Sequence, residues 1–439
     1  MKKKVLIVSR LFSPYNTIGA IRPTKLSKYL NQHENFEVDV ITSKDDKYSI
    51  DSILEIDVKD IPNIYRISNS EKFNKVESIL LNTNNIKNQT SRNVLKVRKN
   101  NKNGILNWFK KFVKHALLIA NEYDYYRQLK KHEINYAKYD IVVSTYSTLG
   151  NVLIANFIKK KGESVKWVAD FRDPIYVDSI PFGFKRFMKL FLNKYLNNID
   201  AITTVSEGTQ ENLFLQNYKK LVQVIPNGYD LEDIDSNIQK QKKFEKFTLT
   251  YTGQLYSGKR DLSILFKAIK ELITEGVVNE SDIMFSYAGN SYNDLFNQAN
   301  KYDLTNIISD NGLIERKNAL ILQKRSHILV MATWNNSNSR GIVTGKFLEY
   351  MMINNPIISL VNGNLEGSKV KEIMNYCDLG ITYESPNHDK DFNQLKEYLL
   401  RHYLMYKQGE IIFSPNKREI NRYNYKEITE NFIHVFNEC

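Results

Sequence analysis

The sequence predicts an α/β protein built from two doubly wound domains, each with a parallel sheet. The chain has 439 residues, a length that suggests two or three domains. In both halves, short runs rich in Val and Ile alternate with stretches of helical period. The runs are continuously apolar, which is typical of parallel strands that helices cover on both faces.

The apolar runs and the stretches of helical period define the expected strands and helices. The expected strands of the first half are Val5–Ser9, Val38–Thr42, Asp140–Ser144, Lys166–Ala169, Ala201–Val205 and Val222–Ile225. Those of the second half are Phe247–Thr252, Met284–Ala288, Ile307–Ser309, Ile328–Met331, Ile357–Val361 and Leu379–Thr382. The helical period of 3.6 residues predicts helices at Arg22–Asn31, Gly150–Lys160, Glu207–Gln216, Leu262–Ile273, Arg316–Lys324, Lys346–Ile353 and Phe392–Tyr406.

Composition shifts mark the domain boundaries. We expect a first domain at residues 1–228, a linker at 229–246, a second domain at 247–409 and a C-terminal segment at 410–439. The linker has no apolar period and carries the basic run Gln239–Lys243. An Asn- and Lys-rich stretch at about 70–105 interrupts the first domain and is interpreted as an insertion.

Composition also narrows the function classes. The two cysteines exclude a disulfide framework and a cysteine-rich zinc site. The apolar run Val5–Ser9 is shorter than a secretory signal or a membrane span requires, so we expect a cytoplasmic protein. The net charge of +13 predicts a polyanionic partner: nucleic acid, anionic lipid or a phosphorylated small molecule. We expect no nucleic-acid partner, because the basic residues are dispersed and no recognition motif is present.

Two segments, 108–118 and 182–196, combine an aromatic stripe at helical spacing with Lys and Arg on the other sides. Such helices can lie on an anionic membrane surface. The same stripe can also face the core of the protein's own domain. Both interpretations stay open for both segments.

Three loops carry candidate ligand-binding residues. The loop after the first strand contains Gly19 but no dinucleotide-binding fingerprint, and a tight turn explains this glycine equally well. A second loop joins Gly253 and Gly258 to the cations Lys259 and Arg260 at a helix start. A helix start already favours anions, so added cations predict a phosphate site, with surface solvation as the alternative.

The third loop leads into a helix that begins near Thr344 or Gly345. Thr344 can cap this helix, and Arg340, Gly341 and Gly345 leave backbone amides for a pyrophosphate. Lys346 and Glu349 share one face, where the carboxylate can accept hydrogen bonds from ribose hydroxyls. A surface Lys–Glu pair is the alternative.

One candidate metal motif occurs in the sequence. Asp233 and Asp235 have the Asp-x-Asp spacing that can hold a divalent cation. They fall in the polar interdomain stretch instead of ending a buried strand, so we expect no metal there. The sequence contains no P-loop, no HExxH and no GxSxG motif.

Characteristic segments are spread along the chain, at Phe12–Arg22, Trp167–Pro174, Thr204–Ser206, Val224–Asp230, Gly253–Lys259 and Lys346–Tyr350 with Pro356. Taken together, these segments make the sequence resemble the retaining glycosyltransferases of family four, in the branch that builds bacterial surface polysaccharides and capsule. Each is weak alone, but their number and order span almost the entire chain. The resemblance implies the GT-B fold, with two Rossmann-like domains facing across a cleft and a last helix, near Tyr425–Phe436, packed on the first domain.

The sequence departs from the family pattern in three places. Gly341 replaces the first glutamate of the two-glutamate motif, so only Glu349 remains. Gln254 stands where a basic residue usually follows the loop glycine. No histidine occurs in the loops after Asp140–Ser144 and Lys166–Ala169, where many members carry one that contacts sugar.

The resemblance implies residue roles and a reaction. The catalytic residues would be Lys259, Arg260 and Glu349, and no metal or cofactor is expected. The donor site would comprise Gly253, Gln254, Gly312, Arg340, Gly341, Thr344, Gly345, Lys346 and Glu349. The acceptor side would comprise Gly19, Arg22, Asp170, Arg172 and Asp173. A carboxylate–arginine cluster of this kind can equally be a structural ion pair.

The function expected from these roles is a retaining, metal-independent transfer of a sugar, hexosyl in type, from a nucleotide-sugar donor, a UDP-sugar, to a saccharide acceptor. The acceptor is expected to be lipid-linked and the protein peripheral on the inner face of a bacterial membrane. Two alternatives stay open: an inactive glycosyltransferase-like subunit that binds a membrane or a partner, and a nucleotide-sugar 2-epimerase.

Overall fold

The computed structural model describes residues 2–45, 48–75, 104–146, 148–162, 164–172, 182–213, 218–337, 343–410 and 413–439, with the backbone alone at 104–111, 182–185 and 212. The chain forms two compact units. Unit 1 comprises Met1–Pro226 and Thr429–Cys439, and unit 2 comprises Asn227–Ile428. The predicted cleft between the two units stays a prediction.

Unit 1 is built on a seven-stranded parallel sheet with the order β3-β2-β1-β4-β5-β6-β7. The strands are β1 (Lys3–Val8), β2 (Phe36–Ser43), β3 (Asn63–Ile67), β4 (Ile141–Tyr146), β5 (Lys166–Phe171), β6 (Ala201–Thr204) and β7 (Leu221–Val224). Val5, Leu6, Ile7 and Val8 are all fully buried, as a strand covered on both faces requires.

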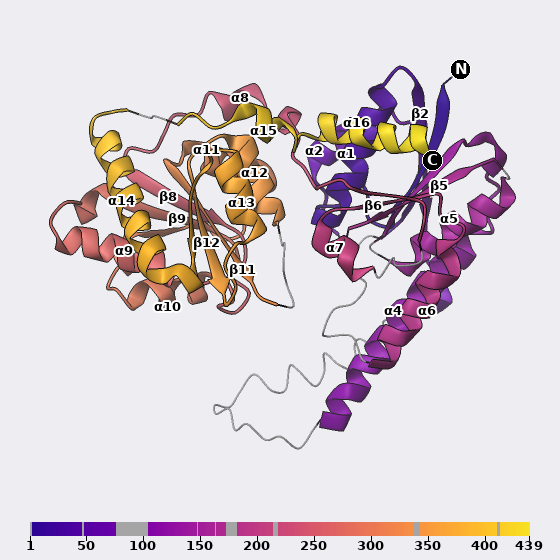
Figure 1. Cartoon of the computed structure of the whole chain (residues 1–439), viewed down its shortest axis with the longest axis horizontal. Coiled ribbons are helices and arrows are strands. Elements are labelled where there is room, and N and C mark those ends of the chain that lie inside the picture. Colours follow the sequence, from indigo (N-terminus) through magenta and orange to yellow (C-terminus); the bar gives the residue numbers. More distant parts are fainter. Residues whose placement is uncertain are drawn as a thin grey trace. The chain divides into compact units, whose positions relative to one another are not determined.

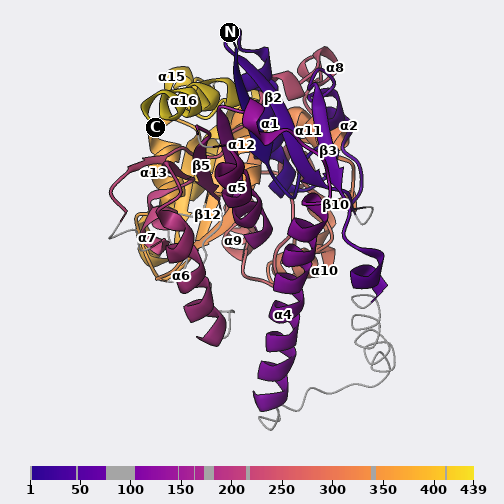
Figure 2. The same ribbon diagram turned by 90° about the vertical axis from the view of Figure 1, so that its right-hand side faces the viewer.

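The helices of unit 1 connect and cover these strands. They are α1 (Ile18–Gln32), α2 (Ser52–Ile56), α4 (Gly104–Leu129), η1 (Tyr136–Lys138), α5 (Leu149–Lys161), α6 (Phe182–Leu196), α7 (Glu207–Asn212) and the last part of α16 (Tyr425–Glu438). Figures 1 and 2 show α4 and α6 extending beyond the edge of the sheet.

Unit 2 repeats the topology with six parallel strands in the order β10-β9-β8-β11-β12-β13. The strands are β8 (Phe247–Thr252), β9 (Ile283–Ala288), β10 (Ile308–Asp310), β11 (Ile328–Asn335), β12 (Ile357–Gly363) and β13 (Gly380–Glu384). Both sheets therefore have the strand order of doubly wound nucleotide-binding folds. The predicted fold class of two Rossmann-like domains is confirmed.

The strands of unit 2 are connected by α-helices and by short 3-10 turns. The α-helices are α8 (Ser236–Gln239), α9 (Ser263–Thr274), α10 (Tyr292–Asn300), α11 (Arg316–Arg325), α12 (Gly345–Ile353), α13 (Lys369–Tyr376), α14 (His388–Lys407) and α15 (Lys417–Asn421). Short 3-10 turns are η2 (Leu231–Asp233), η3 (Glu280–Asp282), η4 (Thr305–Ile307) and η5 (Ser385–Asn387). The core packs α9 and α14 against β8 and β9, with Phe266, Phe285 and Leu395 completely buried.

Two segments bear on the expected domain plan. The stretch 229–246 was expected to be a linker, but it lies within unit 2 and contains η2 and α8. Lys243 explains this, because its partly buried ammonium donates to the carbonyls of Lys324 and Ser326 and to Asn355 Oδ1, at 2.6–3.0 Å. The last residues belong to unit 1, where the Phe436 ring lies 6.1 Å from that of Phe36.

Most of the insertion expected at about 70–105 lies outside the described residues. No helix within the described part of the chain combines the length and apolarity that crossing a membrane demands.

Candidate functional site

The carboxyl edge of the unit 2 sheet has the geometry of a ligand site. The strand order reverses at β8, which has β9 on one side and β11 on the other. In open α/β sheets, ligands bind outside the carboxyl ends of the strands at such a switch point. The loop after β8 and the loop after β11 carry the residues that the sequence predicts for the donor.

The loop after β8 has an unusual backbone. Gly253, Tyr256, Ser257 and Gly258 all have positive φ, at 144°, 50°, 53° and 83°. Tyrosine and serine are strained at positive φ, and such strain is found preferentially at functional sites. The hydroxyl of Tyr251 steadies the loop by donating to the carbonyl of Gln254 at 2.9 Å.

The two cations of this loop have different surroundings. Lys259 is exposed, and its side chain has no hydrogen-bond partner among the described residues; its backbone N–H donates to the carbonyl of Tyr256 at 3.3 Å. Arg260 instead lies against aromatic rings, with its Cζ 4.6 Å from the centroid of Tyr256 and 5.7 Å from that of Trp334. Its Nη1 donates to the carbonyl of Gln254 at 3.1 Å. Lys259 is thus the available cation, while Arg260 braces the loop.

The helix after β11 presents a capped N-terminus. Thr344 is the N-cap of α12, and its hydroxyl accepts from the backbone N–H of Phe347 at 3.3 Å. The predicted cap is therefore present, and the first amides of the helix, at Gly345 and Lys346, are oriented as an anion site requires. Arg340 and Gly341, also predicted for this loop, lie outside the described residues.

Glu349, on the second turn of α12, is a buried and anchored carboxylate. Only 11% of its side chain is exposed. Its Oε1 accepts from Lys346 Nζ at 2.8 Å and from Gln323 Nε2 at 2.6 Å, and Arg316 Nε lies 3.8 Å from Oε2. Burial acts to raise its pKa, but the charges of Lys346 and Arg316 and the Gln323 hydrogen bond hold the pKa of Glu349 below the usual value. The group is ionised at neutral pH.

Gln323 is a part of the site that sequence reasoning missed. It is completely buried on α11, and its Nε2 also donates to Thr252 Oγ1 at 2.9 Å, which ties the end of β8 to Glu349. A signal was present in the sequence, because Gln323 continues the buried face that Leu320 begins. An amide on such a face needs a buried partner.

Gly312 lies at the same edge, after β10. It has a φ of 63°, and its carbonyl accepts from the N–H of Gly289 at 2.8 Å. The structure thus gathers Gly253, Gln254, Lys259, Arg260 and Gly312 in the loops after β8 and β10, and Thr344, Gly345, Lys346 and Glu349 on α12 after β11. Their roles in donor binding stay predictions.

In unit 1 the corresponding switch point, between β1 and β4, is already filled. The Glu122 carboxylate of α4 accepts from Arg10 Nη1 at 2.7 Å and from the N–H of Gly150, in the first turn of α5, at 3.0 Å. Burial raises the pKa of Glu122, against the effect of the Arg10 charge. A carboxylate of the protein thus occupies the anion position of α5, so unit 2 is the better candidate for a phosphorylated ligand.

The residues predicted for the acceptor form a buried network in unit 1. Arg22 pairs with both oxygens of Asp170, at 2.8 and 2.9 Å, and Arg22 and Asp170 are 2% and 0% exposed. Thr203 donates to the same carboxylate at 2.7 Å. This geometry favours the structural alternative for the pair, because neither side chain reaches the surface.

The remaining acceptor-side residues stand near this network. Arg172 Nη1 donates to the carbonyl of Gly19 at 2.6 Å, so these two residues fix each other. A Cβ on Gly19 would come within 2.6 Å of Leu11 Cδ1, the movable end of a side chain, so packing alone does not require glycine there. Asp173 lies outside the described residues.

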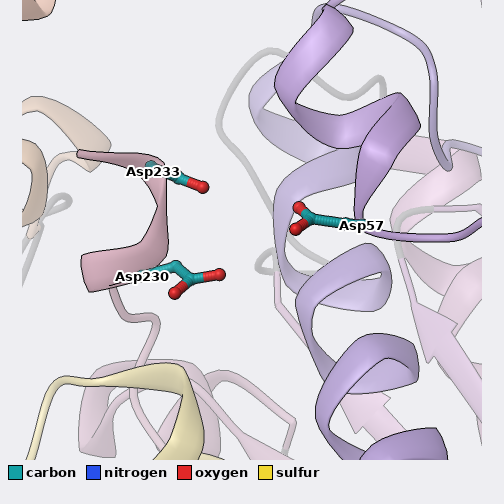
Figure 3. Close-up of side chains that lie close together, drawn as sticks. All are labelled: Asp57, Asp230 and Asp233. Carbon is teal, nitrogen blue, oxygen red and sulfur yellow. The ribbon is translucent and has the colours of Figure 1, made fainter. Parts of the chain in front are cut away.

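The aspartates considered for a metal have cationic partners within their own units. Asp233 accepts from Arg316 at 2.6 Å, and Asp235 pairs with Lys317 at 2.9 Å. Figure 3 shows Asp233 on η2 and Asp230, the residue that caps it. Asp57 pairs with Lys25 and Lys28 of α1, at 2.6 and 2.9 Å. Asp233, Asp235 and Asp57 thus each have a cationic partner, and the expectation that no metal binds there stays a prediction.

Comparisons with known proteins agree with this fold. Residues 90–233, about a third of the chain, match the family model described as Glycosyltransferase Family 4. No curated protein matches the chain.

Solved structures cover the whole chain. A trehalose-6-phosphate structure from E. coli bound with UDP-2-fluoro glucose is 11% identical, with a TM-score of 0.62 over 100% of this chain and 99% of that one. A sucrose-phosphate synthase from Thermosynechococcus elongatus is 12% identical, with a TM-score of 0.58 over 99% and 98%. The lipopolysaccharide outer core galactosyltransferase WaaB is 13% identical, with a TM-score of 0.54 over 98% and 99%. These likenesses establish the GT-B fold.

Proposed function

We propose that this chain is a retaining, metal-independent glycosyltransferase that binds a UDP-sugar donor on unit 2. The observation that carries the proposal is the carboxyl edge around β8 and β11, where adjacent elements supply an available cation, a capped helix N-terminus and an anchored carboxylate. The family match supports the transferase class, and the UDP-2-fluoro glucose of the E. coli neighbour supports the donor class.

The arrangement suits the difficult step of the reaction. When the bond between the sugar and the diphosphate breaks, negative charge grows on the leaving group and positive charge on the sugar. Preorganised positive charge at the leaving group lowers that barrier. Lys259 and the first amides of α12 would supply it, while Glu349 would hold the ribose by accepting hydrogen bonds from its hydroxyls.

Retention of the anomeric configuration requires attack from the face that the leaving group vacates. In the proposed step, the C1–O bond to the phosphate breaks and a C1–O bond to the acceptor hydroxyl forms on the same face. The hydroxyl proton passes to the departing phosphate oxygen. No protein nucleophile and no metal ion is needed for this balance.

The acceptor is proposed to be a lipid-linked saccharide in the synthesis of a bacterial surface polysaccharide. The described part of α6 supports contact with an anionic membrane. Leu192 and Leu196 are buried in the unit 1 core, but Phe187 and Leu190 are 42% and 62% exposed. Arg186 and Lys194 on the same helix are exposed as well. The helix therefore combines core packing with an exposed basic and apolar surface.

Cosedimentation with vesicles of anionic phospholipid at low salt tests this attachment. We expect the wild type to pellet, and Leu190→Ser to pellet less. Leu404→Ser, at an exposed leucine of α14, is the matched control and should pellet like the wild type. Absence of pelleting at low salt would remove the membrane from the proposal.

An assay of sugar transfer tests the activity itself. The full chain would be incubated with UDP-glucose, UDP-galactose or UDP-N-acetylglucosamine and a lipid-linked saccharide fraction, with EDTA present throughout. We expect release of UDP that depends on the acceptor, and a product whose anomeric coupling in NMR matches that of the donor. A product of inverted configuration would refute the retaining mechanism.

A further inference from the structure

An open pocket of about 610 Å³ lies in unit 2 at the carboxyl ends of β8 and β9. One wall is the loop after β8, with Gln254, Tyr256 and Ser257, and the other is the segment 289–294 that leads into α10. Apart from the loop residue Gln254, none of the residues discussed above for the donor lines this pocket. The pocket therefore adjoins the predicted donor residues and shares the loop after β8 with them.

Hydrogen bonds join the two walls of the pocket. The hydroxyl of Tyr287 donates to the carbonyl of Gly253 at 3.0 Å and accepts from the N–H of Ser291 at 2.8 Å. Ser291 Oγ in turn accepts from the N–H of Leu255 at 3.2 Å. These bonds fix the pocket before any ligand arrives, and a preorganised site loses less entropy on binding.

The close approach of the walls depends on a glycine. A Cβ on Gly289 would stand 2.3 Å from the carbonyl oxygen of Gly253 and 2.4 Å from the Tyr287 hydroxyl. Any other residue at this position would push the two loops apart. The same loop holds Tyr256 and Ser257 at positive φ, and strain of this kind accompanies ligand sites.

The lining is polar and carries no cation. It offers the side-chain amides of Gln254, Asn290 and Asn293 and the carboxylate of Asp294, and no Lys, Arg or His belongs to it. Within the part of the chain that the structure describes, the side chains of Gln254, Asn293 and Asp294 form no hydrogen bond. A phosphate would meet the Asp294 carboxylate without a compensating cation, so the pocket does not suit an anion.

The same lining suits a neutral group rich in hydroxyls. Each hydroxyl donates one hydrogen bond and accepts others, each side-chain amide does both, and a carboxylate accepts from several donors. Tyr256 and Tyr292 add aromatic surface for the C–H face of a ring. Arg260 stabilises the first of these rings, with its Cζ 4.6 Å from the centroid.

We infer that this pocket binds a sugar ring. The inference rests on the proposed function for the source of that ring, which is either the sugar of the nucleotide donor or a sugar of the saccharide acceptor. Gln254 and Asp294 would bind its hydroxyls from the two walls, and Arg260 would act as a positioning residue for Tyr256.

Binding measurements on the full chain test the inference and separate the two sources. Calorimetry would compare UDP with UDP-glucose, UDP-galactose and UDP-N-acetylglucosamine, and saturation-transfer NMR would follow methyl α-glucoside, N-acetylglucosamine and maltose. The variants are Asp294→Ala and Gln254→Ala. Glu397→Ala, at an exposed position on α14, is the matched control.

If the pocket holds the donor's sugar, Asp294→Ala weakens UDP-sugar binding about tenfold, the factor that about 1.4 kcal/mol represents, and leaves UDP binding unchanged. If it holds an acceptor sugar, the saccharide signals disappear and donor binding stays. Unchanged UDP binding also shows that the variant is folded. Loss of saccharide signals in a chain that binds no nucleotide supports the pocket and refutes the proposed transferase. Variants that bind every ligand like the wild type overturn the inference.

Discussion

Glu349 shows how single side chains shape the proposed donor site. A carboxylate accepts hydrogen bonds from ribose hydroxyls best when it is ionised and fixed in place. Lys346 and Arg316 keep Glu349 charged, while the amide of Gln323 fixes one of its oxygens at 2.6 Å. Among the described residues, Oε2 has Arg316 Nε beside it, at 3.8 Å, and it can accept further hydrogen bonds.

Gln323 can be tested as the positioning residue for this carboxylate. Gln323→Leu removes the hydrogen bonds to Glu349 and Thr252, and a hydrogen bond to a charged group is worth about 1.5–3 kcal/mol. We expect UDP affinity, measured by calorimetry, to fall about tenfold. An affinity equal to that of the wild type would mean that Gln323 serves the fold alone.

Gln323→Glu provides a readout that a purely structural role would not change. A second carboxylate beside Glu349 raises the pKa of the pair, because two like charges at close range disfavour ionisation. As the pH is lowered, UDP binding by this variant should be lost at a higher pH than in the wild type. Glu397→Gln is the control for a change of charge on the unit 2 surface.

At the scale of elements, the strands were the most predictable part of the sequence. Every expected strand is present, because Val- and Ile-rich runs such as Val5–Val8 pack on both faces. The edge strand Asn63–Ile67 and the helix Lys369–Tyr376 were not predicted. All but the last residue of that strand are only partly buried, so an apolar run was not required there.

The site was predictable only in part. Local features such as the Thr344 cap and the glycines after β8 follow from sequence order. The contacts of Glu349 and of Glu122, the carboxylate at the unit 1 switch point, join residues that are far apart in the chain. Gln323 lies 26 residues from Glu349, and Arg10 lies 112 residues from Glu122. Spacing along one sequence does not encode such contacts.

The C-terminal helix is an element whose contribution can be measured. Phe432 is completely buried in unit 1, and Arg22 Cζ lies 5.1 Å from its ring centroid. Truncating a buried phenylalanine costs about 3–5 kcal/mol. Phe432→Ala should therefore lower the urea concentration at which unit 1 is half unfolded. Circular dichroism monitors this unfolding. His434→Ala, at an exposed position on the same helix, should leave it unchanged.

His327 predicts a pH dependence for unit 2. Its Nδ1 accepts from the N–H of Thr248 at 3.1 Å, and burial, aided by the nearby Lys243 charge, lowers the pKa of His327 to about 4. The unfolded chain therefore binds more protons between pH 6.5 and 4, so stability falls as the pH decreases through this window. One group contributes at most about 1.4 kcal/mol per pH unit.

The measurement compares the thermal midpoint of the wild type with that of His327→Asn between pH 7 and 4. The asparagine oxygen can still accept from Thr248 but does not titrate in this range. We expect a shallower fall for the variant. A histidine elsewhere in unit 2, His402, has a pKa lowered to about 4 by burial and keeps part of the slope in both proteins. Identical slopes would contradict the role of His327.

At the scale of the whole molecule, the two similar sheets differ in whether their switch points have room for a phosphorylated ligand. Unit 1 fills its switch point with the Arg10–Glu122 pair, whereas unit 2 leaves Lys259 and the start of α12 available. This asymmetry assigns the nucleotide-sugar to unit 2 in our proposal and leaves the acceptor to unit 1. The net charge of +13 is consistent with a phosphorylated donor and with an anionic membrane surface.

The most direct test is a thermal-shift panel of UDP, GDP, ADP, CMP and their sugars, with and without EDTA. A ligand at a hundredfold excess over its dissociation constant stabilises the folded protein by about 2.7 kcal/mol. We predict a higher midpoint with uridine nucleotides alone, unaffected by EDTA and lost in Glu349→Ala and Lys259→Ala. No shift with any nucleotide, or a shift that EDTA abolishes, would contradict a metal-independent donor site on unit 2.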